Sequence, residues 1–266
     1  TLSIKATGIC QRPLLDNPLA NEIRYSLHLV GALLPRMKKV TIPLPGGCQI
    51  GTRRLDSYML GLSKLGAEID IRDGHISVES NELHGSHIVL EYPSVSATEN
   101  TMILACLAND TTTIENTAKE PEVVDLASFL NSMGAHICGA GTDTIKIKGV
   151  QELAGTDYTI IPDRIETGTY MVAAGITNGE VLLENTDLSL LESVVSKLGQ
   201  IGVQIEEVPE GARVTSLDKL RPVDIVTEAY PGFPTDMQPI ITPLLSIAEG
   251  KTTIKETIFT GRFNHI

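Results

Sequence analysis

Aromatic residues are scarce in this chain, which contains no tryptophan and only 4% aromatic side chains among its 266 residues. This scarcity excludes proteins that bind single-stranded nucleic acid by stacking bases on aromatic side chains. The sequence also lacks an apolar run long enough to cross a membrane, and no signal-peptide pattern opens it. We therefore expect neither a membrane nor a nucleic acid among its partners.

The usual sequence patterns of metal and disulfide sites are absent as well. The four cysteines (Cys10, Cys48, Cys106 and Cys138) form no closely spaced pairs, and the six histidines are scattered. We therefore expect no metal, no cofactor and a reducing, cytoplasmic location. Cys106 and Cys138 fall in apolar helix and strand patterns, which predicts that both are buried.

Negative charge dominates the chain except in one stretch. The formal net charge is −12, yet residues 24–64 hold seven Lys or Arg residues and one Asp. This stretch therefore has a net charge of +6 and leaves −18 for the remainder. One basic stretch in an acidic protein favours a small anionic substrate, because nucleic acids usually bind a basic domain. A solvated basic surface is the alternative interpretation.

A glycine-rich loop inside the basic stretch carries a cysteine. The run LPGGCQIGTRR places Cys48 among three glycines and follows it with Arg53 and Arg54. Glycines let the backbone approach a ligand closely, and nearby cations lower the pKa of a thiol and attract anions. The pattern predicts a reactive thiol beside an anion site, whereas a buried structural cysteine in an ordinary turn is the alternative.

The chain repeats itself with a period of 68 residues. Gly66, Gly134 and Gly202 occupy the same place in KLGAEID, SMGAHIC and QIGVQIE, and the segments TTTIENT, EVLLENT and KTTIKET recur at nearly the same period. Each repeat is interpreted as strand, helix, strand, helix, strand, strand (βαβαββ). The second repeat predicts a strand at 87–92, a helix at 97–109 capped by Ser96, a strand at 111–116, a helix at 122–133 and a hairpin of 135–138 with 144–148.

The third repeat is interpreted as a second full unit, and the first and fourth repeats as partial ones. The first predicts helices at 21–34 and 55–65, a strand at 39–43 and a hairpin of 68–71 with 75–79; the third runs from 158 to 216 with helices at 168–177 and 188–199; the fourth begins at 223. Such units bury both sheet faces only by sharing a helical core, which predicts an α/β protein with helices packed between small sheets. Residues 156–167 are interpreted as a hinge between two lobes or as an ordinary polar loop.

Six motifs identify a family resemblance. LPGGCQIGTRRLD, PSVSATEN, EPEVVDLASFLNSMGA, IPDRIETGTYMVAA, PGFPTDMQ and ETIFTGRFNH, which lie in register between residues 24 and 266, resemble the UDP-N-acetylglucosamine 1-carboxyvinyltransferases, the MurA enzymes among the enolpyruvyl transferases. The resemblance implies a two-lobed inside-out α/β barrel of βαβαββ units, here truncated at both ends. Residues 1–160 would belong to the first lobe and residues 161–266 to the second.

The resemblance also implies an activity. Enzymes of this kind transfer the enolpyruvyl group of phosphoenolpyruvate to the 3′-hydroxyl of UDP-N-acetylglucosamine and release phosphate, in the first committed step of peptidoglycan synthesis. The reaction therefore serves cell-wall biogenesis, cell shape and cell division. Its substrates are small molecules and it uses no cofactor.

Individual positions take roles from the same resemblance. Cys48 matches the cysteine that protonates phosphoenolpyruvate, forms a pyruvate adduct and is alkylated by fosfomycin, and Asp236 matches the carboxylate beside the attacking sugar hydroxyl. An acid and a base from opposite lobes suit an addition that protonates one reactant and deprotonates the other. The matching substrate-binding positions are Arg24, Arg53, Arg54, Leu55, Asp56, Ser57, Ser94, Val95, Ile258 and Arg262.

The chain departs from the family pattern in several places. Arg54 replaces a usual proline and Ser96 a usual glycine, and the family's N-terminal lysine-asparagine pair and C-terminal arginines have no counterpart. We therefore expect the 266-residue chain not to turn over by itself. An inactive module that binds nucleotide sugars and a 3-phosphoshikimate 1-carboxyvinyltransferase are the alternatives, although the retained Cys48 and Asp236 oppose the first and the cysteine loop opposes the second.

Overall fold

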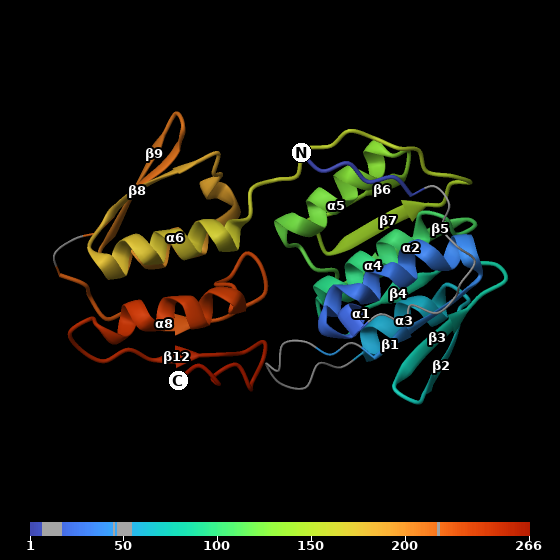
Figure 1. Cartoon of the computed structure of the whole chain (residues 1–266), viewed down its shortest axis with the longest axis horizontal. Coiled ribbons are helices and arrows are strands. Elements are labelled where there is room, and N and C mark those ends of the chain that lie inside the picture. The colour runs from blue at the N-terminus through green and yellow to red at the C-terminus, as the bar shows by residue number, and fades with distance from the viewer. Residues whose placement is uncertain (7–17, 45, 47–54, 217–218) are drawn as a thin grey trace. The chain divides into compact units, whose positions relative to one another are not determined.

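The computed structural model describes residues 1–6, 18–44, 46, 55–216 and 219–266 (Figure 1). These residues form two compact units, each described separately below. Unit 1 comprises the described residues up to Asp157 except Ala118–Asp125, and unit 2 comprises Ala118–Asp125 together with the described part of Tyr158–Ile266.

Unit 1 contains two small sheets. The first has the strand order β1 (Lys39–Pro43), β3 (His75–Glu79), β2 (Glu68–Arg72), with antiparallel neighbours. The second has the order β4 (His87–Val89), β5 (Thr111–Glu115), β7 (Thr144–Lys148), β6 (His136–Cys138), in which only β4 and β5 are parallel. The connection from β4 through α4 (Val95–Ala105) to β5 and through α5 (Pro121–Ser132) to the hairpin is the predicted βαβαββ repeat.

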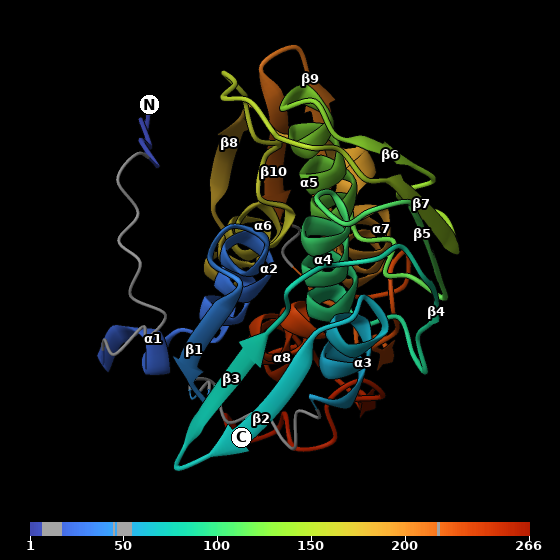
Figure 2. The same cartoon turned by 90° about the vertical axis from the view of Figure 1, so that its right-hand side faces the viewer.

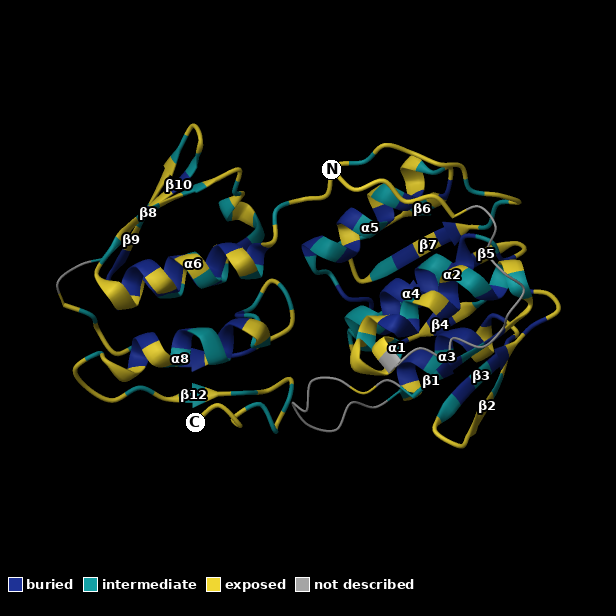
Figure 3. Ribbon diagram, in the orientation of Figure 1, coloured by how far each residue is buried: buried dark blue, intermediate teal, exposed yellow. Residues whose placement is uncertain are grey.

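The helices of unit 1 lie between its two sheets. The N-terminal part contains α1 (Pro18–Glu22), a 3₁₀ turn η1 (Arg24–Leu27) and α2 (His28–Met37), and α3 (Asp56–Lys64) follows β1. Helices α2 and α3 cover the β1–β3–β2 sheet and both pack against α4, which covers β5 and β7 (Figure 2). The faces that helices and strands turn toward one another are the buried ones in Figure 3, as the repeat pattern predicts.

Close helix packing in unit 1 depends on two glycines. The amide of Gly31 in α2 donates to Asn100 Oδ1 of α4 at 3.1 Å, and a Cβ added at Gly61 in α3 would lie 2.0 Å from Thr101 Oγ1 of α4. Gly31 and Gly61 thus meet the middle of α4, whereas His28 at the start of α2 contacts Glu99 in the first half of α4 at 2.9 Å. The hydroxyl of Tyr58 in α3 also donates to the carbonyl of Leu27, just before α2, at 2.8 Å. The three helices therefore run parallel and begin at the same end of unit 1.

Substituting Gly61 tests this packing. We expect Gly61→Ala to lower the free energy of unfolding by about 1–3 kcal/mol, because the fully enclosed Thr101 has no room to withdraw. The matched control is Gly199→Ala, since the Cβ added there meets no atom within 4 Å and alanine reduces the entropy of the unfolded chain. The urea concentration at the midpoint of unfolding should therefore fall in Gly61→Ala and rise in Gly199→Ala. Equal shifts of the two midpoints would contradict the packing described.

Unit 2 repeats the same construction with a partial sheet at each side. The order β8 (Glu180–Glu184), β10 (Gly211–Ser216), β9 (Val203–Val208) is antiparallel, and β11 (Ile225–Val226) pairs in parallel with β12 (Ile254–Lys255). Its helices are α6 (Arg164–Thr177), η2 (Leu188–Leu191), α7 (Glu192–Ile201), η3 (Thr235–Met237) and α8 (Gln238–Ser246). Their apolar faces bury a common core that includes Met171, Leu198 and Leu244.

Helices α6 and α8 run parallel in unit 2. A Cβ at Gly168 would meet Met237 at 2.8 Å, and seven residues further on a Cβ at Gly175 would meet Leu244 at 3.3 Å, which is also seven residues beyond Met237. The equal spacing shows that both helices advance together and begin at the same end of unit 2. Arg164 and Asp236, one at the start of α6 and the other in η3, are therefore brought to that end.

The three repeat glycines end helices. Gly66, Gly134 and Gly202 follow α3, α5 and α7, and their φ angles of +95°, +103° and +118° lie in the left-handed region that favours glycine. The other predicted boundaries shift by a few residues. Ser94 instead of Ser96 caps α4 by accepting the Ala97 amide at 3.4 Å, and α6, which Asp163 caps, begins four residues before the predicted start. The opening strand expected at the start of the third repeat is not formed, since residues 158–163 have no strand partner among the described residues.

Candidate active site

Several predicted substrate-binding residues lie at the common helix-start end of unit 1. Arg24 begins η1, Asp56 and Ser57 begin α3 after Leu55, and Val95 begins α4 after its cap Ser94. Helix N-termini present unpaired amide groups and a partial positive charge, so this end of unit 1 suits anionic ligands. Cys48, Arg53 and Arg54 lie outside the described residues.

The side chains at this end differ in accessibility. Asp56 is exposed, Ser57 is buried and Leu55, Ser94 and Val95 are partly exposed. Below them Tyr58 is enclosed, and burial raises its pKa well above the ordinary value of 10.0 despite a hydrogen bond with Asn100. Sequence reasoning did not find the neighbouring pair of His28 Nε2 and Glu99 Oε2, which approach to 2.9 Å with both side chains largely buried.

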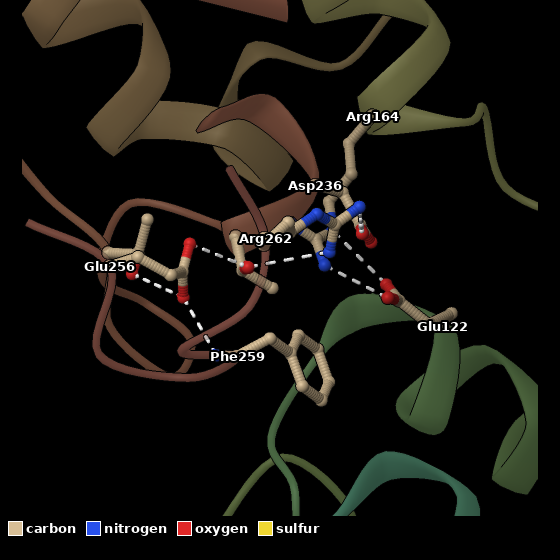
Figure 4. A network of polar contacts seen from close by, with 8 residues as sticks. Glu122, Arg164, Asp236, Glu256, Phe259 and Arg262 are labelled. Carbon is tan, nitrogen blue, oxygen red and sulfur yellow. Dashed lines mark hydrogen bonds and ion pairs between the residues drawn. The ribbon is translucent and has the colours of Figure 1, made fainter. Parts of the chain in front are cut away.

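In unit 2, Asp236 and Arg262 form an ion pair. The guanidinium Nη2 of Arg262 lies 2.5 Å from Asp236 Oδ1, and the Asp236 side chain is 54% exposed whereas that of Arg262 is 13% exposed (Figure 4). Arg262 also stacks on the Phe259 ring, with its Cζ 5.9 Å from the ring centroid. The structure thus brings two predicted site residues together and presents one accessible carboxylate oriented by a buried cation.

A second arginine lies beside this pair. Arg164 is 9% exposed and binds Glu122 through two parallel hydrogen bonds, of 3.1 Å from Nε and 2.9 Å from Nη2. Burial lowers the pKa of Arg164, but the bonds to Glu122 and the charges of Glu122, Glu120 and Asp236 outweigh it, so the net pKa is raised. Asp236 therefore faces two fixed positive charges, which could also hold an anionic group of a substrate.

Glu120, two residues before Glu122, is a buried carboxyl group. Its Oε2 atom has no hydrogen-bond partner within the described residues. Burial, reinforced by the charge of Glu122, raises its pKa above the ordinary 4.5, although backbone hydrogen bonds and Arg164 act in the opposite sense. The charged form is thus the one that the folded state disfavours.

A pH titration of stability tests this description of Glu120. A carboxyl group whose pKa is raised on folding contributes a stability that is present below its unfolded pKa and is lost as the pH rises through the folded value. Replacing Glu120 by Gln removes that loss, so the stability of the variant relative to the parent should increase as the pH rises above the ordinary carboxyl pKa of 4.5. Urea midpoints measure the difference, with the exposed Glu249→Gln as control; a pH-independent difference would contradict the shift.

Ile258 lies in the loop that follows β12. Its side chain is 40% exposed, and its amide donates to the carboxylate of Glu256 at 2.8 Å. The same carboxylate accepts the hydroxyl of Thr235, the residue before Asp236, at 2.9 Å. Ile258, Asp236 and Arg262 therefore share one part of unit 2, which joins the ends of β11 and β12 to η3.

Sequence reasoning assigned no role to Arg164, Glu122 or Glu256. All three lie in the motifs IPDRIETG, EPEVV and ETIFTGRFNH that carry the family resemblance, but no chemical role was attached to them there. Residues 163–166 were read as part of a hinge or polar loop, whereas Arg164 begins α6 and bonds to Glu122, 42 residues earlier. The tertiary fold determines which residues pair over such a distance along the chain, and a local sequence pattern does not reveal these pairs.

The two cysteines in the described residues differ. Cys106, the C-cap of α4, is buried as predicted, and burial raises the pKa of its thiol to about 12. The prediction that Cys138 is buried is wrong, because it lies in the edge strand β6 on the face turned away from the helices. Within the described part of the chain no group of three or more metal-ligating side chains occurs, and no helix is long and apolar enough to cross a membrane.

Comparisons with known proteins match this architecture. The family model described as EPSP synthase (3-phosphoshikimate 1-carboxyvinyltransferase) matches residues 7–266, nearly the whole chain. The chain belongs to this family. The enolpyruvyl transferase NikO from Streptomyces tendae has the same fold, with a TM-score of 0.79 at 23% identity over 95% of this chain and 61% of that one. The enolpyruvyl transferase-like α/β fold predicted from the repeats and motifs is thereby confirmed.

Within the enolpyruvyl transferase family, the chain is similar to UDP-N-acetylglucosamine 1-carboxyvinyltransferases. A UDP-N-acetylglucosamine 1-carboxyvinyltransferase of Caldanaerobacter subterraneus subsp. tengcongensis is 48% identical over 248 residues, and one of Halothermothrix orenii is 47% identical over 251 residues. These matches cover 93% and 94% of this chain and 60% of each relative. The resemblance seen in the six motifs is confirmed, and the chain spans about 60% of the length of these relatives.

Proposed function

We propose that this chain is part of an enzyme that transfers the enolpyruvyl group of phosphoenolpyruvate to the 3′-hydroxyl of UDP-N-acetylglucosamine in the cytoplasm. The observation that carries the proposal is the 48% identity to a UDP-N-acetylglucosamine 1-carboxyvinyltransferase over 93% of the chain. An EPSP synthase from Acinetobacter baumannii shares the fold at only 20% identity and a TM-score of 0.59. The acceptor is therefore proposed to be the nucleotide sugar rather than a shikimate phosphate.

The chemistry requires a proton at one carbon and the loss of a proton from one hydroxyl. In the proposal Cys48 gives its proton to the methylene carbon of phosphoenolpyruvate, while the sugar oxygen adds to the neighbouring carbon and Asp236 takes its proton. A proton of the new methyl group then passes back to the Cys48 thiolate as the C–O bond to phosphate breaks, which releases phosphate and leaves the enol ether. An ionised carboxylate is an acceptor only, so the half-exposed oxygens of Asp236 suit the role of base.

The surrounding residues divide the remaining tasks. Arg262 and Arg164 hold Asp236 and offer charge to the anionic groups of the substrates. Arg24 and Arg53 are proposed to bind phosphate groups, while Arg54, Leu55, Asp56, Ser57, Ser94 and Val95 border the nucleotide. Ile258 is proposed to contact the sugar. Residues 1–160 and 161–266 are proposed to belong to the first and second lobes.

The choice of acceptor is the test of this proposal. A complete enzyme can be made by replacing the matching segment of the Caldanaerobacter relative with this chain. Phosphate release is then measured with phosphoenolpyruvate and either UDP-N-acetylglucosamine or shikimate 3-phosphate. We expect release only with the nucleotide sugar. Release only with shikimate 3-phosphate, or binding of the nucleotide sugar without turnover, would replace the proposal by one of its two alternatives.

A further inference from the structure

Glu256 occupies a repeat position at which the chain changes residue type. TTTIENT, EVLLENT and KTTIKET align Glu256 with Asn116 and Asn185. Both asparagines adopt left-handed backbone conformations, with φ of +56° and +52°, and the Asn116 side chain donates to the Leu90 carbonyl. Glu256 is not among the residues with positive φ in the described chain and can only accept. The fourth repeat therefore replaces a turn residue by an anion.

The Glu256 carboxylate accepts four hydrogen bonds from three segments (Figure 4). Its Oε1 accepts the Thr227 hydroxyl at 2.8 Å and the amides of Ile258 and Phe259 at 2.8 and 3.0 Å. Its Oε2 accepts the Thr235 hydroxyl at 2.9 Å. One side chain thus joins the end of β11, the loop after β12 and the residue adjacent to Asp236.

The hydrogen bond from Thr235 to Glu256 determines that Thr235 acts as an acceptor toward Arg262. A threonine hydroxyl has a single proton, and in Thr235 that proton points to Glu256. Its lone pairs are then left to accept Nη1 of Arg262, at 3.4 Å, and Nη2 of the same guanidinium binds Asp236. Glu256 therefore orients Arg262 through Thr235, and Arg262 orients Asp236.

We infer that Glu256 is a positioning residue, which holds the carboxylate of Asp236 in its reactive orientation through Thr235 and Arg262. The inference rests on the proposed function, because it concerns the group proposed to take the proton of the sugar. Glu256 itself need not touch a substrate. Its effect should therefore appear in turnover, since misplacement of a catalytic group by about 1 Å costs up to about 10²-fold in rate.

Two pairs of variants separate positioning from general support of the fold. Glu256→Gln keeps the size of the side chain, but its amide group turned toward Thr235 is a donor, so the hydroxyl proton must turn away from it and the bond from Arg262 to Thr235 is disturbed. Thr235→Val breaks only that connection, whereas Thr227→Val breaks a different bond to the same carboxylate. In the complete enzyme we expect Glu256→Gln and Thr235→Val to lower kcat by about 10- to 100-fold with little change in KM. Thr227→Val and the exposed Glu249→Gln should change kcat far less.

A double-mutant cycle provides the decisive kinetic result. If Glu256 acts through Asp236, then adding Glu256→Gln to an Asp236→Asn enzyme should cause no further loss of kcat. An additive loss, or a loss in Thr227→Val as large as in Thr235→Val, would overturn the inference and leave Glu256 as a support of the loop. Thermal unfolding of each variant identifies any that fail to fold.

A second measurement does not depend on turnover. The carboxyl ¹³C signal of Asp236 and the side-chain ¹⁵N signals of Arg262 should both move in Glu256→Gln and Thr235→Val and stay in place in Glu249→Gln. Unmoved signals in the first two variants would overturn the inference. An enzyme that shows these shifts but transfers nothing to the nucleotide sugar would contradict the proposed function and uphold the positioning role, so the two failures are distinguishable.

Discussion

Replacement of Cys48 by Ser is expected to lower turnover of the complete enzyme by about 10²- to 10⁴-fold, the range typical of general acid catalysis. A serine hydroxyl is a far weaker acid than a thiol, so the proposed protonation of phosphoenolpyruvate loses its donor. The substitution should also abolish covalent modification by fosfomycin. Rates of phosphate release and the mass of the protein after fosfomycin treatment measure the two effects.

Cys138→Ser is the matched control for this experiment. Cys138 is exposed, so ordinary thiol reagents should reach it, whereas the buried Cys106 with its pKa of about 12 should stay unlabelled until the chain unfolds. Fosfomycin should nevertheless modify only Cys48, because the proposed selectivity comes from the anion site. Equal labelling of Cys48 and Cys138 by fosfomycin, or full turnover of the Cys48→Ser enzyme, would contradict the role proposed for this loop.

Asp236→Asn is expected to lower kcat by about 10²- to 10⁴-fold while the KM for UDP-N-acetylglucosamine changes little, since a base assists chiefly in the transition state. Asparagine keeps the size of the side chain and can still accept a hydrogen bond from Arg262, but it cannot take up a proton. Initial rates at saturating concentrations of both substrates measure the effect.

The control for Asp236 is another carboxylate of unit 2. Asp187 caps η2 by accepting the Ser189 amide at 3.0 Å, and an asparagine there can accept the same bond. Asp187→Asn should leave turnover unchanged. A kcat of the Asp236→Asn enzyme equal to that of this control would remove Asp236 from the chemistry and with it the proposed division between acid and base.

The parts of the fold that could be predicted from the sequence are those that each repeat contains within itself. The glycines at 66, 134 and 202 end helices because no other residue adopts their φ without strain, and β1 and β3 form over the predicted ranges 39–43 and 75–79. The start of α6 was misplaced because Asp163 caps it through a short-range bond that the apolar pattern does not reveal.

The candidate site could be predicted only where a motif already carried a chemical interpretation. Asp236, Arg262 and Ile258 were named, and the structure places them in one part of unit 2. Glu122 and Arg164 were missed because they lie 42 residues apart along the chain, and Glu256 because its hydroxyl partners Thr227 and Thr235 lie 29 and 21 residues away. The change from Asn to Glu in the third copy of the repeated segment was a signal for Glu256 in the sequence.

Transfer of the enolpyruvyl group to one oxygen of the sugar is the central claim, and a labelled substrate tests it most directly. The complete enzyme is incubated with ¹³C-labelled phosphoenolpyruvate and UDP-N-acetylglucosamine, and the product is analysed by NMR correlation across the new ether bond. We predict a correlation between the labelled enol carbon and the 3′ position of the sugar, together with one phosphate released per product. Label that remains in phosphoenolpyruvate, or that appears at another acceptor, would contradict the account.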